Sequence, residues 1–178
     1  MAFYDREVDV MIDTATLQAK ITELGKQITK DYLGRDLTLL GIMKGSVFFL
    51  TDLAKAIDLP VTIELMGVSS YQGGTETTGE VRLTYDVTKP MAGKHVLIVE
   101  DIIDTGLTMS FLLENFQARH VASVKVCTLL EKPMRAKTKV PIDYKGFVIE
   151  DRFVVGYGLD FGEKFRNLPF IGVMKQGD

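Results

Sequence analysis

Three stretches of this sequence are apolar at nearly consecutive positions, and they restrict its fold more than any other feature. They are LTLLGI (37–42), HVLIVEDI (95–102) and SVKVCTLLEK (123–132). Each has the length of a strand, and none alternates polar and apolar residues as a half-buried strand does. Strands that are apolar on both sides are typical of parallel sheets, which helices cover on both faces.

Segments with helical spacing lie between these strands. Residues 14–33 repeat apolar side chains every three or four positions, and Asp13 or Thr14 can cap the start. Further helices are expected at 46–57 and 108–119. The alternation of strand and helix predicts an α/β fold with a central, mainly parallel sheet flanked by helices. No linker or repeat interrupts it, which predicts a single domain over residues 1–178.

The remaining segments are less regular. A strand at 61–71 ends in hydroxyl side chains, and the polar stretch QGGTETTGE (72–80) is expected to be a mobile loop or hairpin tip. EVRLTYDVT (80–88) fits the returning strand. Short apolar pieces follow near the C-terminus, at 147–151, 153–160 and 168–174.

Composition narrows the class of protein. The net charge is −3, so no overall basic surface indicates binding to nucleic acid. No apolar run approaches the roughly 20 residues of a membrane span, and the acidic start does not resemble a signal peptide. The single cysteine, Cys127, has no partner for an internal disulfide and is expected to lie unreactive in a strand. The expected compartment is the cytoplasm.

Acidic residues gather where the strand 95–102 ends. Glu100 and Asp101 are adjacent, so in an extended strand they point to opposite faces, but where the strand ends this restriction relaxes. Both are then expected to reach one ion, and two carboxylates suit Mg²⁺, which shares its remaining positions with water and substrate oxygens. Asp104 follows in the loop, where a carboxylate can accept a proton from a bound group.

The next four residues, Thr105, Gly106, Leu107 and Thr108, open a helix. Unpaired N–H groups and the positive end of the helix dipole favour an anion there, and glycine lets the backbone approach a phosphate. Each feature alone fits solvated acids and an ordinary helix cap. Together they predict metal ligands, a base and an anion cradle within nine residues.

This segment, VLIVEDIIDTGLT, resembles the phosphoribosyl-pyrophosphate-binding signature of the type I phosphoribosyltransferases. The resemblance implies the fold of that family: a twisted sheet with flanking helices, a small hood built from the N- and C-terminal segments, and a flexible lid loop. It also implies that Glu100 and Asp101 face the ribose and its metal, that the loop 105–108 binds the 5′-phosphate, and that Asp104 acts as the base.

GIMKGS (41–46) is similar to the family's pyrophosphate loop, in which a cis peptide often precedes the lysine. The resemblance implies that the Met43–Lys44 bond is that peptide. It also implies that Lys44 and Gly45 present N–H groups to pyrophosphate, with Arg166 as a further pyrophosphate ligand.

LLEKP (129–133), FVVGYGLD (153–160) and EKFRNLP (163–169) resemble the 6-oxopurine branch, the hypoxanthine–guanine phosphoribosyltransferases. By this resemblance Lys132 donates to the purine 6-oxo group and Phe153 stacks on the ring, while backbone groups near Val154 and Asp160 meet its other edge. The Asp160 side chain helps to hold a second Mg²⁺. Ser70 and Tyr71 belong to the lid.

The resemblance therefore implies an enzyme of purine salvage, a glycosyltransferase that uses Mg²⁺ and phosphoribosyl pyrophosphate. It transfers the phosphoribosyl group to N9 of hypoxanthine or guanine and yields IMP or GMP. The preferred purine, and whether xanthine is accepted, stay open. A homodimer or homotetramer is expected, without nucleic-acid or membrane partners.

Two other classes of protein share parts of this pattern. A regulatory protein on the same fold would use the donor site as a sensor, but it would need a basic face or a nucleic-acid-binding extension. A signalling receiver domain places its acids near the start and its Lys-Pro far downstream, whereas here about 30 residues separate the two motifs. Taken singly, Lys132, Phe153, Tyr71 and Arg166 also fit ordinary exposed or core positions.

Overall fold

The computed structural model describes residues 7–70 and 81–175. Its main body is a six-stranded sheet in the order β4-β3-β2-β5-β6-β7. The central strands β2 (Leu37–Met43), β5 (His95–Ile103) and β6 (Ser123–Glu131) are parallel, as are β3 (Val61–Ser70) and β7 (Tyr144–Val148). Only the edge strand β4 (Val81–Tyr85) is antiparallel, paired with β3. The predicted α/β class and mainly parallel sheet are confirmed.

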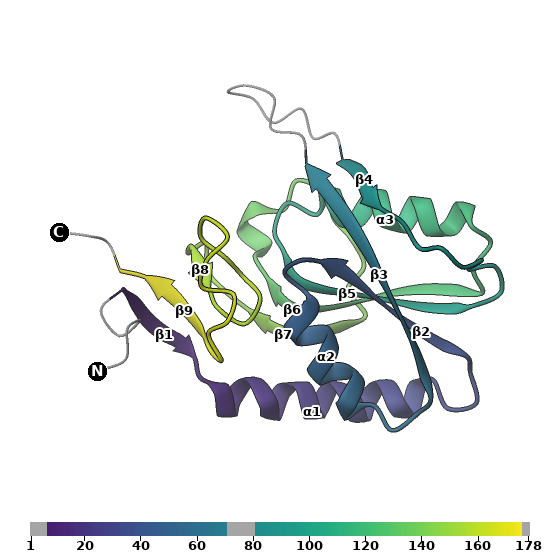
Figure 1. Cartoon of the computed structure of the whole chain (residues 1–178), viewed down its shortest axis with the longest axis horizontal. Helices are drawn as coiled ribbons and strands as arrows, with labels where there is room; N and C mark the ends of the chain where they lie inside the picture. Colours follow the sequence, from purple (N-terminus) through teal and green to yellow (C-terminus); the bar gives the residue numbers. More distant parts are fainter. Residues whose placement is uncertain (1–6, 71–80, 176–178) are drawn as a thin grey trace.

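Helices cover both faces of this sheet, which is why its central strands β2 and β5 are buried over most of their length (Figure 1). On β5, Leu97 and Val99 pack in the core shared with α1 (Thr14–Asp31) and α2 (Val47–Ala56). Their neighbours Val96 and Ile98 pack in the core shared with α3 (Leu107–Ala118). The two faces of one strand thus belong to two hydrophobic cores.

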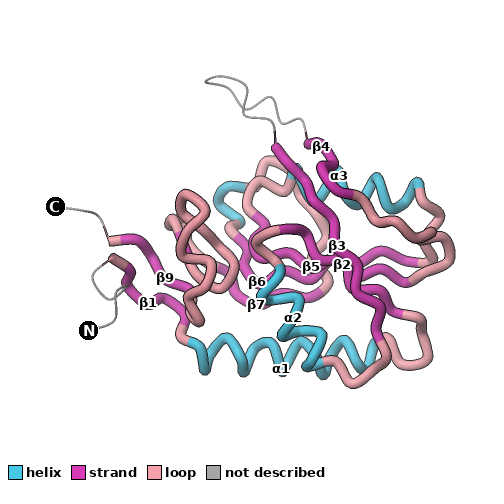
Figure 2. The backbone as a smooth tube through the Cα atoms, viewed as in Figure 1, coloured by secondary structure: helices cyan, strands magenta, loops and turns pink. Residues whose placement is uncertain are grey.

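A second, smaller sheet stands beside the first and forms the hood. It has the order β1-β9-β8, built from β1 (Val8–Ile12), β8 (Val154–Val155) and β9 (Ile171–Met174). Figure 2 shows that β1 leads into α1 and that loops make up much of the hood. The hood therefore joins the two ends of the chain, as the family resemblance implied.

Cys127 lies in β6 and is fully buried, and burial raises the pKa of its thiol above the usual range. None of the described helices is long and apolar enough to span a membrane. A one-turn 3-10 helix, Pro133–Arg135, follows β6 and brings further charged residues to the sheet edge described next.

Candidate active site

The carboxyl ends of β2 and β5 border a cavity of about 210 Å³, which we name the strand-end cavity. Such an edge is where ligands bind in open α/β sheets. Most of the residues of the β5 signature line it, together with the loop after β2. The predicted site residues that line this cavity are Gly45, Glu100, Asp101, Asp104, Thr105, Gly106 and Thr108.

Glu100 and Asp101 both line this cavity, but the prediction that the strand ends beside them was wrong. β5 continues to Ile103, so both are still strand residues. The Asp101 carboxylate also lies directly under Gly45, where an added Cβ would be 1.9 Å from its Oδ2.

Burial raises the pKa of both carboxyl groups above its usual range, and the neighbouring Asp101 charge raises that of Glu100 further. Within the described part of the chain, neither carboxylate has a lysine or arginine nitrogen within ion-pairing distance. A half-buried acid next to a buried one, without a direct cationic partner, forms an electrostatically costly arrangement.

This donor set fits Mg²⁺, which is usually held by one or two carboxylates and completes its shell with water and substrate oxygens. Within residues 7–70 and 81–175, no three acidic, histidine or cysteine side chains gather into a closed metal-binding group. A metal at Glu100 and Asp101 would thus share its shell with a ligand. Asp160 lies in the hood loop after β8 and does not line the strand-end cavity.

The loop after β5 leads into α3 through Gly106, whose backbone is left-handed with φ 80°. Gly106 occupies the N-cap position of α3 and has no side chain with which to bind the first N–H groups of the helix. Leu107 is the first residue of α3 and does not itself line the cavity. The Thr105 hydroxyl lies 3.5 Å from the Leu107 nitrogen. The helix start therefore suits an anion such as phosphate.

Asp104 lies between this cavity and a second, more open one that Lys132 also lines. Asp104 Oδ1 is 3.1 Å from Arg135 Nε, an ion pair without hydrogen-bond geometry. Arg135 lies 3.8 Å from Asp151, which is also 3.8 Å from the Lys132 ammonium. Three further charges thus gather beside the predicted base.

Sequence reasoning missed two members of this group, Arg135 and Asp151. Arg135 is the third residue after Lys132, in the turn that follows β6. Asp151 is the third residue after the end of β7. The available signal was their position just beyond the carboxyl ends of neighbouring parallel strands. Lys132 itself is only 6% exposed, which is unusual for a lysine and places it inside the site.

In the hood, Phe153 is 56% exposed and makes an edge contact with Phe161, with ring centroids 5.7 Å apart. One aromatic ring is thus left partly open to stack on a ligand. Val154 is buried and pairs with Val173 in the hood sheet, so its side chain belongs to the core. Phe153 and Val154 do not line the strand-end cavity.

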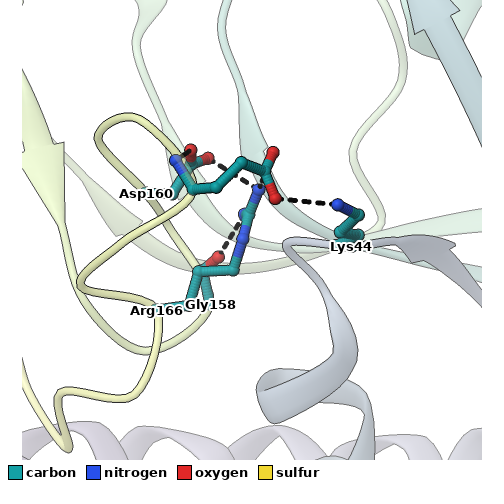
Figure 3. A network of polar contacts seen from close by, with 5 residues as sticks. Lys44, Gly158, Asp160 and Arg166 are labelled. Carbon is teal, nitrogen blue, oxygen red and sulfur yellow. Dashed lines mark hydrogen bonds and ion pairs between the residues drawn. The ribbon is translucent and has the colours of Figure 1, made fainter.

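A polar network links the hood to the loop after β2 (Figure 3). Arg166 donates to the Gly158 carbonyl oxygen at 2.7 Å and pairs with Asp160 at 2.8 Å. Lys44 pairs with Glu163 at 2.7 Å, and Glu163 lies 3.3 Å from Arg166. The Met43–Lys44 peptide bond is cis, as the resemblance implied. The structure thus brings together the predicted pyrophosphate ligands, Lys44, Gly45 and Arg166, with Asp160 beside them.

The predicted lid can be followed only in part. Ser70 is the last residue of β3, and Tyr71 lies outside the described residues.

The chain is similar in sequence to proteins of known family. The sequence profile of the phosphoribosyl transferase domain matches residues 12–162. The chain is 48% identical over 167 residues to a hypoxanthine-guanine phosphoribosyltransferase of Staphylococcus aureus, covering 94% of this chain and 93% of that protein. It is also 48% identical over 171 residues to the Streptococcus pneumoniae protein of that name, covering 96% and 94%.

Solved structures agree with the sequences. A crystal structure of a hypoxanthine phosphoribosyltransferase from Staphylococcus aureus superposes with a TM-score of 0.90 at 48% identity, covering 94% of this chain and 91% of that one. A hypoxanthine-guanine phosphoribosyltransferase from Bacillus anthracis, with a HEPES molecule in its active site, gives a TM-score of 0.88 at 45% identity. It covers 93% of this chain and 97% of that one.

Proposed function

The chain belongs to the phosphoribosyl transferase domain family, and from that membership we propose that it is a glycosyltransferase of purine salvage. It transfers the 5-phosphoribosyl group of phosphoribosyl pyrophosphate to N9 of hypoxanthine or guanine, which yields IMP or GMP and pyrophosphate. The observation that carries the proposal is the strand-end cavity, where two adjacent acids, a further Asp and a helix start converge.

The strand-end cavity is assigned to the ribose 5-phosphate. The start of α3, with Thr105, Gly106, Leu107 and Thr108, binds the 5′-phosphate through backbone N–H and hydroxyl groups. Glu100 and Asp101 hold the ribose hydroxyls, directly or through the metal. Fixing the sugar at both ends orients its anomeric carbon, and orientation alone can supply much of a rate enhancement.

The purine is assigned to the side of the cavity where Asp104 and Lys132 meet the second opening. Asp104 accepts the N7 proton as N9 attacks, with Arg135 positioning its carboxylate at 3.1 Å. Lys132 stabilises negative charge on the 6-oxo group. Phe153 stacks on the ring, and backbone groups near Val154 and Asp160 meet its far edge.

The leaving pyrophosphate is assigned to the network of Figure 3. Lys44, Gly45 and Arg166 present positive charge and N–H groups where negative charge develops as the glycosidic bond breaks. The sugar carbon then has oxocarbenium character, as in glycoside hydrolysis. Ser70 and Tyr71 belong to the lid that keeps water from the reactive sugar.

Mg²⁺ is the proposed cofactor, with Glu100 and Asp101 as ligands of one ion and Asp160 as a ligand of a second. When bound, the metal neutralises the donor's phosphate oxygens and the departing pyrophosphate.

A regulatory sensor on the same fold is not favoured, because the relatives at 48% identity are named as enzymes.

Assembly as a homodimer or homotetramer is also proposed. Val47, Phe48 and Ile63 expose apolar surface on α2 and β3 that suits a contact between copies. Light scattering that gives the mass of one chain would contradict this assembly.

The proposal is tested by IMP formation from hypoxanthine, phosphoribosyl pyrophosphate and Mg²⁺, with the wild-type chain and Asp104→Asn. A general base contributes about 10²–10⁴-fold, so we expect kcat to fall at least about 100-fold in the variant. Donor binding should stay within a few-fold of wild type, because Asp104 faces the purine. Calorimetric titration with phosphoribosyl pyrophosphate and Mg²⁺ measures that affinity.

Asp58→Asn is a matched control, since Asp58 is an exposed aspartate after α2 and lies outside the site. It should keep the wild-type rate. Near-normal turnover of Asp104→Asn would disprove the role of Asp104 as base, and the absence of IMP with the wild-type chain would disprove the function.

A further inference from the structure

The carboxylate of Glu163 lies between the two cations assigned to pyrophosphate. Its Oε2 is 2.7 Å from the Lys44 ammonium, and its Oε1 is 3.3 Å from the Arg166 guanidinium. Figure 3 shows Arg166 and Asp160 of the hood loop facing Lys44 in the loop after β2. One carboxylate therefore makes the two contacts that an anionic ligand of the same site would need.

The backbone holds Glu163 in this place. Its φ is 66°, a left-handed conformation that is unfavourable for a non-glycine residue. Its N–H donates to Asp160 Oδ2 at 2.8 Å, and a backbone bridge between Phe161 and Lys164 closes the turn. The side chain thus projects from a built turn.

The ion pair between Lys44 and Glu163 can compete with an anionic ligand for Lys44, but such a ligand can also displace it. The side chains of Lys44 and Glu163 are 69% and 65% exposed, and ion pairs this exposed contribute little to stability. The hydrogen bond from Lys44 lowers the pKa of Glu163, so its carboxylate is charged at neutral pH.

We propose that Glu163 is an internal counterion that occupies the pyrophosphate subsite in the free chain and that pyrophosphate must displace it. This inference rests on the proposed function, which assigns Lys44 and Arg166 to pyrophosphate. Glu163 thereby lowers the affinity for the product and favours its release.

If Glu163 instead positioned the two cations, its removal would change the affinity for pyrophosphate in the opposite direction. A carboxylate that only held Lys44 and Arg166 in position would raise the affinity for pyrophosphate, since binding is tighter when the cations are ordered beforehand. Its removal would then weaken binding. The direction of the change therefore decides between a counterion that competes and a residue that positions.

The experiment is a calorimetric titration of the full chain with pyrophosphate in MgCl₂, comparing wild type, Glu163→Gln and Glu114→Gln. Losing a competing pair of up to about 1 kcal/mol corresponds to about fivefold tighter binding in Glu163→Gln. Glu114 is exposed on α3. Glu114→Gln therefore removes the same charge far from the network and should change the affinity less than about twofold. The gain should shrink at about 1 M salt, where screening is strong.

Unchanged or weaker binding in Glu163→Gln would overturn the inference and leave the proposed function standing. An equal gain in Glu114→Gln would also overturn it, because the effect would then be one of net charge. If the wild-type chain bound no pyrophosphate, the pyrophosphate assignment of the proposed function would fail first, and the inference with it.

Discussion

At the scale of single residues, Glu100 and Asp101 show how this site conflicts with stability. Both are acids on a buried strand, and the pKa of each is raised because burial disfavours the charged form. Above their ordinary pKa range these carboxyl groups therefore make folding less favourable, because the unfolded chain ionises and hydrates them at lower cost. Residues held for a ligand in this way are where a more stable variant is expected to lose function.

We predict that Glu100→Gln melts at a higher temperature than wild type at pH 7.5 without ligands. The folded-state pKa of Glu100 lies above its unfolded value, so wild type loses stability as pH rises through that range. The variant escapes this loss. For a chain of this length each kcal/mol corresponds to about 2–4 °C, so a gain of about 2 °C or more is expected.

Thermal melts measured over a range of pH test whether Glu100→Gln is more or less stable than wild type. The difference in melting temperature should close as pH falls toward 4.5, the ordinary value for a glutamate. A variant that is less stable than wild type at pH 7.5, or a difference that does not depend on pH, would show that burial of this acid is not costly.

The sequence identified the residues of the β5 signature because they are contiguous and their spacing carries the chemistry. Arg135 and Asp151 escaped because each is a charged residue in a turn, and only the pairing of β5, β6 and β7 brings them to Asp104. Glu163 was missed because it is the only acid in EKFRNLP (163–169), a motif that was recognised for its Arg166. The local sequence does not show which distant residues come into contact in the fold.

At the scale of elements, the sheet, the loop after β2 and the hood touch through glycines. Gly45 lies over Asp101, and Gly158 of the hood lies over Gly45, where an added Cβ would be 1.9 Å from the Gly45 carbonyl oxygen. Tyr157 adds a hydrogen bond of 2.6 Å from the hood to Asp52 on α2. The hood is therefore fixed against the pyrophosphate loop by backbone contact.

We predict that Gly158→Ala separates these elements. Gly158 has φ 105°, so alanine is strained there, and its Cβ would overlap the backbone of Gly45. Overpacking of this kind costs about 1–3 kcal/mol beyond the strain. Urea unfolding should show that loss, and titration with pyrophosphate in MgCl₂ should show weaker binding because the loop that presents Lys44 has moved.

Gly34→Ala is the matched control, since Gly34 has φ 76° and a Cβ there would meet nothing within 4 Å. It should lose about 1 kcal/mol and bind pyrophosphate normally. Equal losses of stability in the two variants would mean that the contact between Gly158 and Gly45 contributes nothing.

The predicted helices and the strands β2, β3, β5 and β6 agree with the structure within one or two residues, because apolar runs and helical spacing identify buried strands and helices. β4 ends three residues before the predicted segment 80–88 does, and β7 lies three residues before the predicted segment 147–151. The hood strands were harder. Residues 8–12 contain one acid among four apolar side chains, in a segment noted only as acidic, and β8 has two residues. Their pairing with β9 depends on contacts between the two ends of the chain, which local patterns do not carry.

At the scale of the whole molecule, the proposed assignments divide the substrate between the two sheets. In this proposal the large sheet carries Glu100 to Thr108 for the sugar phosphate, while the hood carries Phe153 for the purine and Arg166 for pyrophosphate. Lys44 and Lys132 come from the ends of β2 and β6 and lie between the two. The bond to be broken is thus placed where sheet and hood meet.

The most direct test of this account is a panel of bases, each supplied with phosphoribosyl pyrophosphate and Mg²⁺ while nucleotide formation is measured. We predict turnover with hypoxanthine or guanine and little or none with adenine, uracil or orotate, because Lys132 stabilises a 6-oxo group and adenine carries an amine there. A preference for adenine or a pyrimidine, or no nucleotide from any base, would contradict the account.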